Sequence, residues 1–106
     1  MRIAIVEDNA AEADSLAAML SEWSDARGCT IAVSKYVSPL IFLEKCRSDG
    51  FDAVFMDIEM PNMNGMDASA RLREIDKDVI IVFVTNMAQF ALDGYGVSAL
   101  VLLSSR

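Results

Sequence analysis

The sequence predicts a single α/β domain built around a parallel β-sheet. Five short runs of apolar and β-branched residues alternate with stretches that carry apolar residues at helical spacing. The connections between these runs are short, and such alternation favours parallel strands joined by right-handed crossovers. The chain has 106 residues, of which 54% are hydrophobic, so it can build one core and is too apolar to be disordered. We therefore expect the element order β-α-β-α-β-α-β-α-β.

The first strand and helix occupy the amino-terminal quarter of the chain. Residues 2–6 form a short apolar run that is typical of a strand. Asp8 or Asn9 follows it, and either side chain can cap the helix that comes next. This helix is expected to end by about Gly28. Its inward positions, at helical spacing, are Ala13, Leu16, Leu20 and Trp23.

The second strand and helix follow directly. Residues 29–37 are rich in β-branched side chains and predict a strand. Ser38 and Pro39 then form a helix-start signal, with serine as the cap and proline in the first turn. Asp49 and Gly50 close this helix. Its inward face is expected to carry Leu40, Leu43 and Cys46.

The third strand is the stretch around which the chain is organised. Residues 53–56 form an apolar run that ends abruptly in Asp57, which is typical of a strand buried on both faces. Pro61 and Gly65, with asparagines between them, indicate a turn into a third helix that runs to about Ile75. Asp57 therefore stands at the carboxyl end of a buried strand, where open α/β sheets place their ligands. The inward positions of the third helix are Ala68, Leu72 and Ile75.

The last elements are a strong strand, a short helix and a final strand. Residues 79–84 form the most strand-like run in the chain, and Thr85 follows it. A short helix is expected over about residues 88–93, ended by the Gly-Tyr-Gly sequence at 94–96. Residues 99–103 form the fifth strand.

The charge and composition exclude several classes of function. Nine basic and sixteen acidic residues give a net charge of −7, which argues against direct binding to nucleic acid or to an acidic membrane. No signal peptide or membrane-spanning stretch is visible, so we expect a cytoplasmic location. Cys29 and Cys46 fit no zinc spacing and are expected to stay reduced. The chain has no histidine, so any histidine chemistry must come from a partner.

Polar side chains stand at three strand ends that a parallel sheet places along one edge. Glu7 and Asp8 follow the first strand, Asp57 ends the third, and Thr85 follows the fourth. If the first and third strands are neighbours, the three carboxylates converge and repel one another unless a cation joins them. Hard oxygen ligands favour Mg²⁺. A carboxylate beside Mg²⁺ can attack phosphorus to form an acyl phosphate, and Thr85 can hydrogen-bond a phosphoryl oxygen.

Each of these residues also has a purely structural interpretation. Glu7 and Asp8 can complement the dipole of the first helix. Asp57 can cap the turn that follows it, and Thr85 can cap the fourth helix. The coincidence of all of them at one sheet edge favours a functional site.

The same residues resemble the receiver domain of a two-component response regulator. The resemblance extends from residue 2 to about residue 103, and residues 57–65 are its most specific part. Residues 91–95 and 98–100 look like the receivers attached to LytTR-type DNA-binding domains. The matching residues are Glu7 and Asp8 after the first strand, Asp57 with Pro61 and Gly65 behind it, and Thr85 after the fourth strand.

This resemblance implies a fold and a set of roles. The fold is a three-layer, flavodoxin-like, doubly wound sheet of five parallel strands in the order 2-1-3-4-5. Asp57 would be the phosphoacceptor of a sensor histidine kinase, and Thr85 the switch hydroxyl. Mg²⁺ would be held by Asp8 and Asp57, by Glu7 through water, and by the backbone carbonyl of Glu59. Such a domain is a signalling switch in transcription regulation, and at most it catalyses its own aspartyl phosphorylation and dephosphorylation.

The carboxyl-terminal end departs from the family pattern. The lysine that follows the fifth strand in the family falls on Ser105, and the proline after it falls on Arg106. The aromatic switch position falls on Leu102. The family's fifth helix has no counterpart, so we expect a receiver domain over residues 1–106 that is truncated at its end. The cation that clamps the phosphoryl group is then missing, unless Arg106 substitutes for it.

Three functions are weighed on these grounds. The first is a phosphorylatable receiver, and the second is a receiver-like interaction module with impaired phosphorylation, favoured by the altered end. The third is a Mg²⁺-dependent phosphohydrolase with Asp57 as nucleophile and Glu59 as a second acid, for which no substrate-covering cap is visible. The apolar face that a fifth helix covers in the family also predicts a homodimer, or a strand-exchanged pair, that buries this face.

Overall fold

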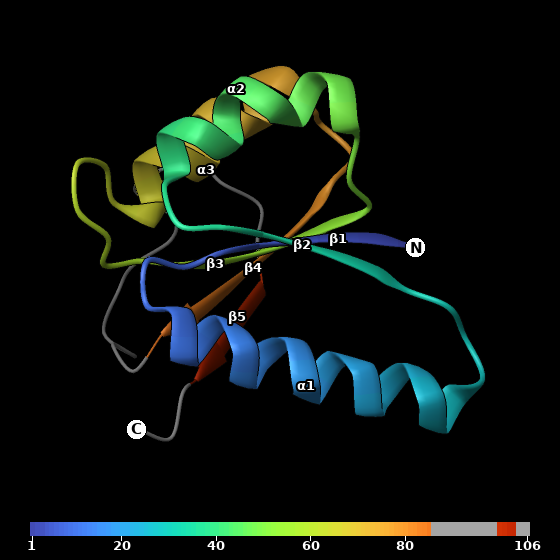
Figure 1. The fold of residues 1–106 in the computed structure, drawn as a ribbon. Helices are drawn as coiled ribbons and strands as arrows, with labels where there is room; N and C mark the ends of the chain where they lie inside the picture. The colour runs from blue at the N-terminus through green and yellow to red at the C-terminus, as the bar shows by residue number, and fades with distance from the viewer. Residues whose placement is uncertain (86–99, 104–106) are drawn as a thin grey trace.

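A parallel five-stranded sheet forms the middle layer of the fold (Figure 1). The fold is known from a computed structural model, which describes residues 1–85 and 100–103. The strands lie in the order β2-β1-β3-β4-β5, and every neighbouring pair is parallel. This arrangement confirms the expected strand order. The strands are β1 (Arg2–Val6), β2 (Ala32–Tyr36), β3 (Ala53–Asp57), β4 (Ile80–Thr85) and β5 (Leu100–Leu103).

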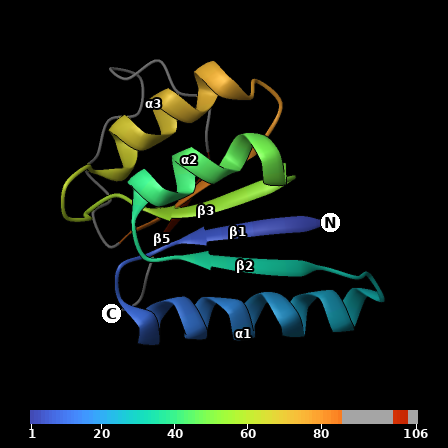
Figure 2. The ribbon, with the colours of Figure 1, turned by 45° about the horizontal axis from the view of Figure 1, so that its top comes forward.

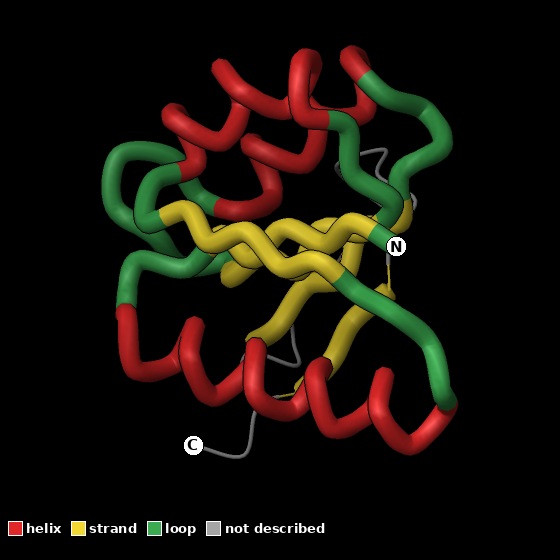
Figure 3. Tube along the Cα trace, turned by 45° about the vertical axis from the view of Figure 1, so that its right-hand side comes forward, coloured by secondary structure: helices red, strands yellow, loops and turns green. Residues whose placement is uncertain are grey.

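Helices cover both faces of this sheet. The helix α1 (Ala10–Arg27) lies on one face, and α2 (Pro39–Asp49) and α3 (Gly65–Ile75) lie side by side on the other (Figures 1 and 3). This placement follows from right-handed crossovers between strands whose order reverses after β2. The short helix expected over residues 88–93 and its terminator at 94–96 lie outside the described residues. None of the helices in the described part is both long and apolar enough to cross a membrane.

Local capping signals fix where the helices begin. Of the two candidate caps for α1, the structure selects Asn9, whose side chain accepts a hydrogen bond from the backbone N–H of Glu12 at 3.1 Å. The same kind of contact caps α2 at Ser38 and α3 at Asn64. At the other end of α1, Gly28 takes a left-handed conformation with φ 67°, which a side chain disfavours.

The second strand is shorter than the sequence suggests. Ala32 is its first residue, although the β-branched run begins at Cys29. The N–H of Cys29 still donates to the carbonyl of Ser24 at 3.0 Å, so this residue completes the end of α1. The other strands begin and end within one residue of the expected positions.

The core consists of two apolar clusters, one on each side of the sheet. Alternating residues of β1 supply both, because neighbouring side chains of a strand point to opposite faces. The larger cluster packs the sheet against α2 and α3, and the smaller one packs it against α1 (Figure 2). The fully buried members of the larger cluster include Phe42, Val54, Met56, Met66, Ala68 and Phe83. The smaller cluster contains Ile3, Ile5, Ala13, Leu20 and Ala53.

Two positions expected to face inward do not. Trp23 is 41% exposed and its ring lies 5.2 Å from the guanidinium of Arg27, while Ser24 takes the buried position in the last turns of α1. Leu40 is 43% exposed, and Phe42 fills the core in its place. In both helices, more than one face carries apolar residues at helical spacing. The sequence pattern therefore does not decide which face packs against the sheet.

Candidate functional site

The carboxyl ends of β1 and β3 lie beside each other at one edge of the sheet. Val6, the last residue of β1, pairs with Met56 of β3, so the next residues on each strand, Glu7 and Asp57, are neighbours. The backbone N–H of Glu7 donates to the carbonyl of Tyr36 at 2.9 Å, which extends the ladder to β2 by one residue. Strand pairing therefore positions both acidic residues.

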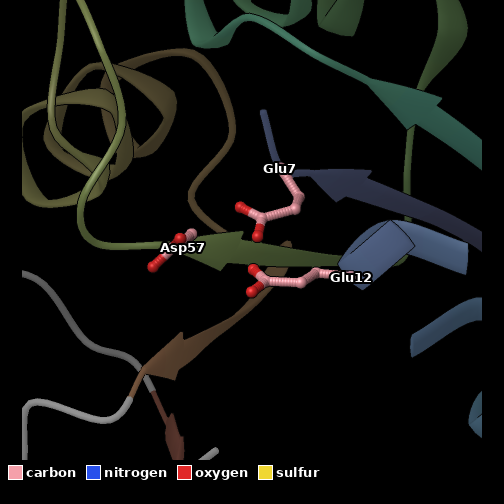
Figure 4. A group of neighbouring side chains, drawn as sticks. All are labelled: Glu7, Glu12 and Asp57. Atoms are coloured by element: carbon pink, nitrogen blue, oxygen red, sulfur yellow. The ribbon is translucent and has the colours of Figure 1, made fainter. Parts of the chain in front are cut away.

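Three carboxylates converge at this edge, from three different segments. One carboxylate oxygen each from Glu7, Glu12 and Asp57 lies within 4.8 Å of the other two. Glu12 belongs to the first turn of α1. Figure 4 shows the side chains of Glu7 and Glu12 directed toward each other beside the end of β3, where Asp57 lies. This group is the candidate metal centre of the described part of the chain.

The membership of this group differs from the expected one. The sequence pointed to Glu7, Asp8 and Asp57, but the side chain of Asp8 is exposed and does not belong to the group. Its role as a metal ligand stays a prediction. Glu12 was not predicted, because it lies in a helix and not directly after a strand. Its signal is a capping-box pattern, with Asn9 at the cap and a glutamate three residues later.

Glu7 is the most buried member of the group. Only 7% of its surface is exposed, and its Oε2 atom has no hydrogen-bond partner among the described residues. Burial, hydrogen bonds with the side chains of Glu12 and Asp57, and the negative charges of those two residues raise the pKa of Glu7 to about 9. Without a cation, Glu7 therefore carries a proton at neutral pH.

The donor set fits a hard divalent cation. Carboxylate oxygens are the ligands that Mg²⁺ and Ca²⁺ prefer, and a cation relieves the repulsion between three close acids. The unpartnered Oε2 atom of Glu7 is a buried acceptor that such an ion can satisfy. Glu7, Glu12 and Asp57 are the side chains that this structure offers for the purpose.

The loop after β3 holds Asp57 in place. The N–H of Glu59 donates to Oδ1 of Asp57 at 3.3 Å, and the N–H of Gly65 donates to the carbonyl of Ile58 at 2.7 Å. The loop also contains Asn62, whose φ of 73° is a left-handed conformation that asparagine tolerates. The side chain of Glu59 is exposed. Metal binding by its backbone carbonyl stays a prediction.

The remaining predicted residues lie on β4, on β5 or after β5, the strands beyond β3 in the sheet. Val84 of β4 pairs with Asp57, so the backbone of Thr85 lies one residue further along the same sheet edge. Its role as the switch hydroxyl stays a prediction. Leu102 belongs to β5, while Ser105 and Arg106 lie outside the described residues.

The chain matches the family model of the response regulator receiver domain over residues 3–102. It is 28% identical over 99 residues to the positive alginate biosynthesis regulatory protein of Pseudomonas aeruginosa, covering 93% of this chain and 39% of that protein. It is 27% identical over 100 residues to the sensory transduction protein LytT of Bacillus subtilis, covering 94% of this chain and 40% of that one. The chain thus spans about two fifths of the length of these curated relatives.

Solved structures share the fold. One is the receiver domain of a sensor histidine kinase from Pseudomonas aeruginosa, described with a magnesium ion coordinated in its active site cleft. It superposes with a TM-score of 0.79 at 22% sequence identity, covering 99% of this chain and 85% of that one.

Proposed function

This chain belongs to the response regulator receiver domain family, and from that premise we propose that its Asp57 accepts a phosphoryl group from the phosphohistidine of a sensor histidine kinase. The family match confirms the resemblance found in the sequence, including the similarity to LytTR-type regulators such as LytT. A receiver is a signalling module of two-component systems rather than a conventional enzyme. The finer assignment of roles to single residues is our proposal.

The observation that carries the proposal is the placement of Asp57. Its carboxylate ends a buried strand and lies in a group with Glu7 and Glu12. In the transfer, an Asp57 oxygen forms a bond to phosphorus as the phosphorus–nitrogen bond of phosphohistidine breaks, which leaves an acyl phosphate. The hydrogen bond from the Glu59 N–H orients the accepting carboxylate.

A bound Mg²⁺ supplies the positive charge that offsets repulsion between the carboxylates and the incoming phosphoryl group. We propose that Asp57 and Asp8 hold it with their carboxylates, Glu7 through water or directly, and Glu59 with its backbone carbonyl; the convergence of the Glu7 and Asp57 carboxylates supports this. Thr85 is proposed to hydrogen-bond a phosphoryl oxygen, since its backbone lies at the same edge of the sheet.

Membership of the receiver domain family also suggests where the chain acts and with which partners. We propose that the chain acts in the cytoplasm, where kinase and regulator meet, and contributes to transcription regulation through an output domain of the LytTR kind. With a net charge of −7, the receiver itself is not expected to bind nucleic acid.

We propose a homodimer as its assembly. Among the described residues, only α1 covers its face of the sheet, and Ile80 of β4 is 49% exposed.

The dimer can be checked by static light scattering. The protein at micromolar concentration should give twice the mass of one chain. Ile80→Lys should shift the distribution toward the monomer, because it puts a charge into an apolar contact. A monodisperse wild-type monomer would contradict the dimer.

Phosphorylation is tested with a small phosphodonor. The wild-type chain, incubated with acetyl phosphate and Mg²⁺, should gain the mass of one phosphoryl group in intact-protein mass spectrometry. Asp57→Asn should abolish the adduct. Asp78→Asn, which removes an exposed carboxylate after α3, should keep it. An adduct that persists in Asp57→Asn would place the phosphoacceptor elsewhere.

A second function has an observation in its favour. Ser105 and Leu102 stand where the family pattern has a lysine and an aromatic residue. A chain that binds Mg²⁺ but gains no adduct, even from its kinase, would favour a receiver-like interaction module. Steady phosphate release from unrelated esters would instead favour a phosphohydrolase.

A further inference from the structure

Glu12 is the one member of the acidic group to which the family resemblance assigns no role. Its position is nevertheless fixed. Its backbone N–H donates to the side chain of Asn9, and Ala13, the next residue, is buried against the sheet. The first turn of α1 therefore cannot rotate to carry Glu12 away from the edge without losing both contacts.

The geometry around Glu12 is that of a cation site. Its carboxylate lies within 4.8 Å of those of Glu7 and Asp57. Glu7, with 7% of its surface exposed, directs its carboxylate toward that of Glu12 beside Asp57 (Figure 4), and its Oε2 atom lacks a hydrogen-bond partner in the described part. In the absence of metal a proton on Glu7 stabilises this arrangement, and a bound cation can replace that proton and satisfy the unpartnered acceptor.

We propose that Glu12 is a further carboxylate ligand of the divalent cation at this site and that it shifts the selectivity of the site from Mg²⁺ toward Ca²⁺. The proposal rests on the cation site that the proposed function assumes. Mg²⁺ is usually bound through one or two carboxylates and keeps several waters, whereas Ca²⁺ takes six to eight oxygen ligands in flexible geometry. An additional carboxylate from a helix suits the larger ion.

The test is a calorimetric titration with each metal alone. Wild-type protein, Glu12→Gln and Glu22→Gln are titrated with CaCl₂ and with MgCl₂ at equal ionic strength. Glu22 is an exposed glutamate of the same helix, so its replacement removes the same charge at a distance from the site. Glu12→Gln should weaken Ca²⁺ binding by about tenfold or more, and Mg²⁺ binding by less. Glu22→Gln should leave the ratio of the two affinities as in the wild type.

Thermal unfolding separates a ligand from a structural residue. In EDTA, Glu12→Gln should melt at the wild-type temperature or above it, because it removes repulsion within the group. With saturating Ca²⁺, its gain in melting temperature should be smaller than that of the wild type. Unchanged affinities in Glu12→Gln overturn the proposal. So does an equal loss of affinity in Glu22→Gln, or a lower melting temperature in EDTA.

The outcome is distinguishable from that of the phosphorylation test. If Glu12→Gln changes the metal affinities and the wild type gains no phosphoryl adduct, the cation site is supported and the proposed phosphorylation is contradicted. If the adduct forms and the metal affinities do not depend on Glu12, the receiver activity stands and this inference falls.

Discussion

Gly65 lies directly against the backbone of Asp57. A Cβ atom at residue 65 would overlap the carbonyl oxygen of Asp57 and would lie 2.9 Å from its carbonyl carbon. It would also lie 3.0 Å from the Cα of Ile58. The start of α3 is thus pressed onto the end of β3, and the absence of a side chain at residue 65 is what permits this approach.

Gly65→Ala should therefore destabilise the domain by about 1–3 kcal/mol, because the overlap involves backbone atoms that no side-chain rotation can relieve. It should also weaken cation binding by displacing Asp57. Urea denaturation and a metal titration measure the two effects. Gly28→Ala is the matched control: a Cβ there meets nothing within 4 Å, so it should cost only the strain of its φ of 67° and leave metal affinity unchanged. Wild-type stability and affinity in Gly65→Ala would contradict the close packing.

Stability should depend on pH through Glu7. Its pKa is raised to about 9 in the folded chain, against an ordinary value of 4.5. Between these values the unfolded chain loses this proton while the folded chain keeps it, so the free energy of unfolding falls as pH rises. Denaturation in EDTA at several pH values from 5 to 9 should show the fall, and Glu7→Gln should reduce it. Mg²⁺ should also reduce it, because the cation binds the ionised form. An identical slope in wild type and Glu7→Gln would exclude this residue as its source.

Phe42 should be a principal contributor to stability. It is fully buried, and its ring centroid lies 5.4 Å from that of Tyr36 and 5.9 Å from that of Phe51. Phe42→Ala should lower the free energy of unfolding by about 3–5 kcal/mol, a large part of what a domain of this size has. Ile41→Ala, at a neighbouring position that is 44% exposed, should cost under about 1 kcal/mol. Both losses are measured by urea denaturation. Similar losses in the two variants would mean that burial does not determine how much a side chain of α2 contributes to stability.

The resemblance predicts that serine at position 105 stands in place of the family's lysine. A cation beside the phosphoryl group stabilises the charge that develops during transfer. Ser105→Lys should therefore accept phosphate from acetyl phosphate faster than the wild type, as timed by intact mass. Ser104→Lys adds the same charge one residue earlier and serves as the control. Equal rates in all three proteins would mean that another group already fills the lysine's role.

Local signals in the sequence predicted most of the fold. Asn9, Ser38 and Gly28 each act through hydrogen bonds or dihedral preferences within a few residues, so the limits of α1 and the start of α2 were predictable. The helix faces were predicted less well. Trp23 and Leu40 are exposed because the rotation of a helix is decided by the sheet beneath it, which a spacing pattern does not contain.

The candidate site was predictable in part for the same reason. Glu7 and Asp57 are brought together by the pairing of β1 with β3, and this pairing was expected from the family resemblance rather than from residue patterns. Glu12 comes from a helix, and its approach to the edge depends on how α1 packs. A pattern of acids at strand ends does not include it.

The turn into α3 also bears on chemical ageing. Asn64 followed by Gly65 is a dipeptide prone to deamidation, in which the glycine nitrogen attacks the asparagine side-chain carbonyl, ammonia leaves, and water then opens the resulting succinimide. In the folded chain this nitrogen donates its hydrogen to Ile58, and the side-chain oxygen of Asn64 accepts the N–H of Asp67 at 2.8 Å. The same contacts that shape the site therefore protect the side-chain amide of Asn64, and slow conversion of Asn64 to aspartate during storage would report how often this turn opens.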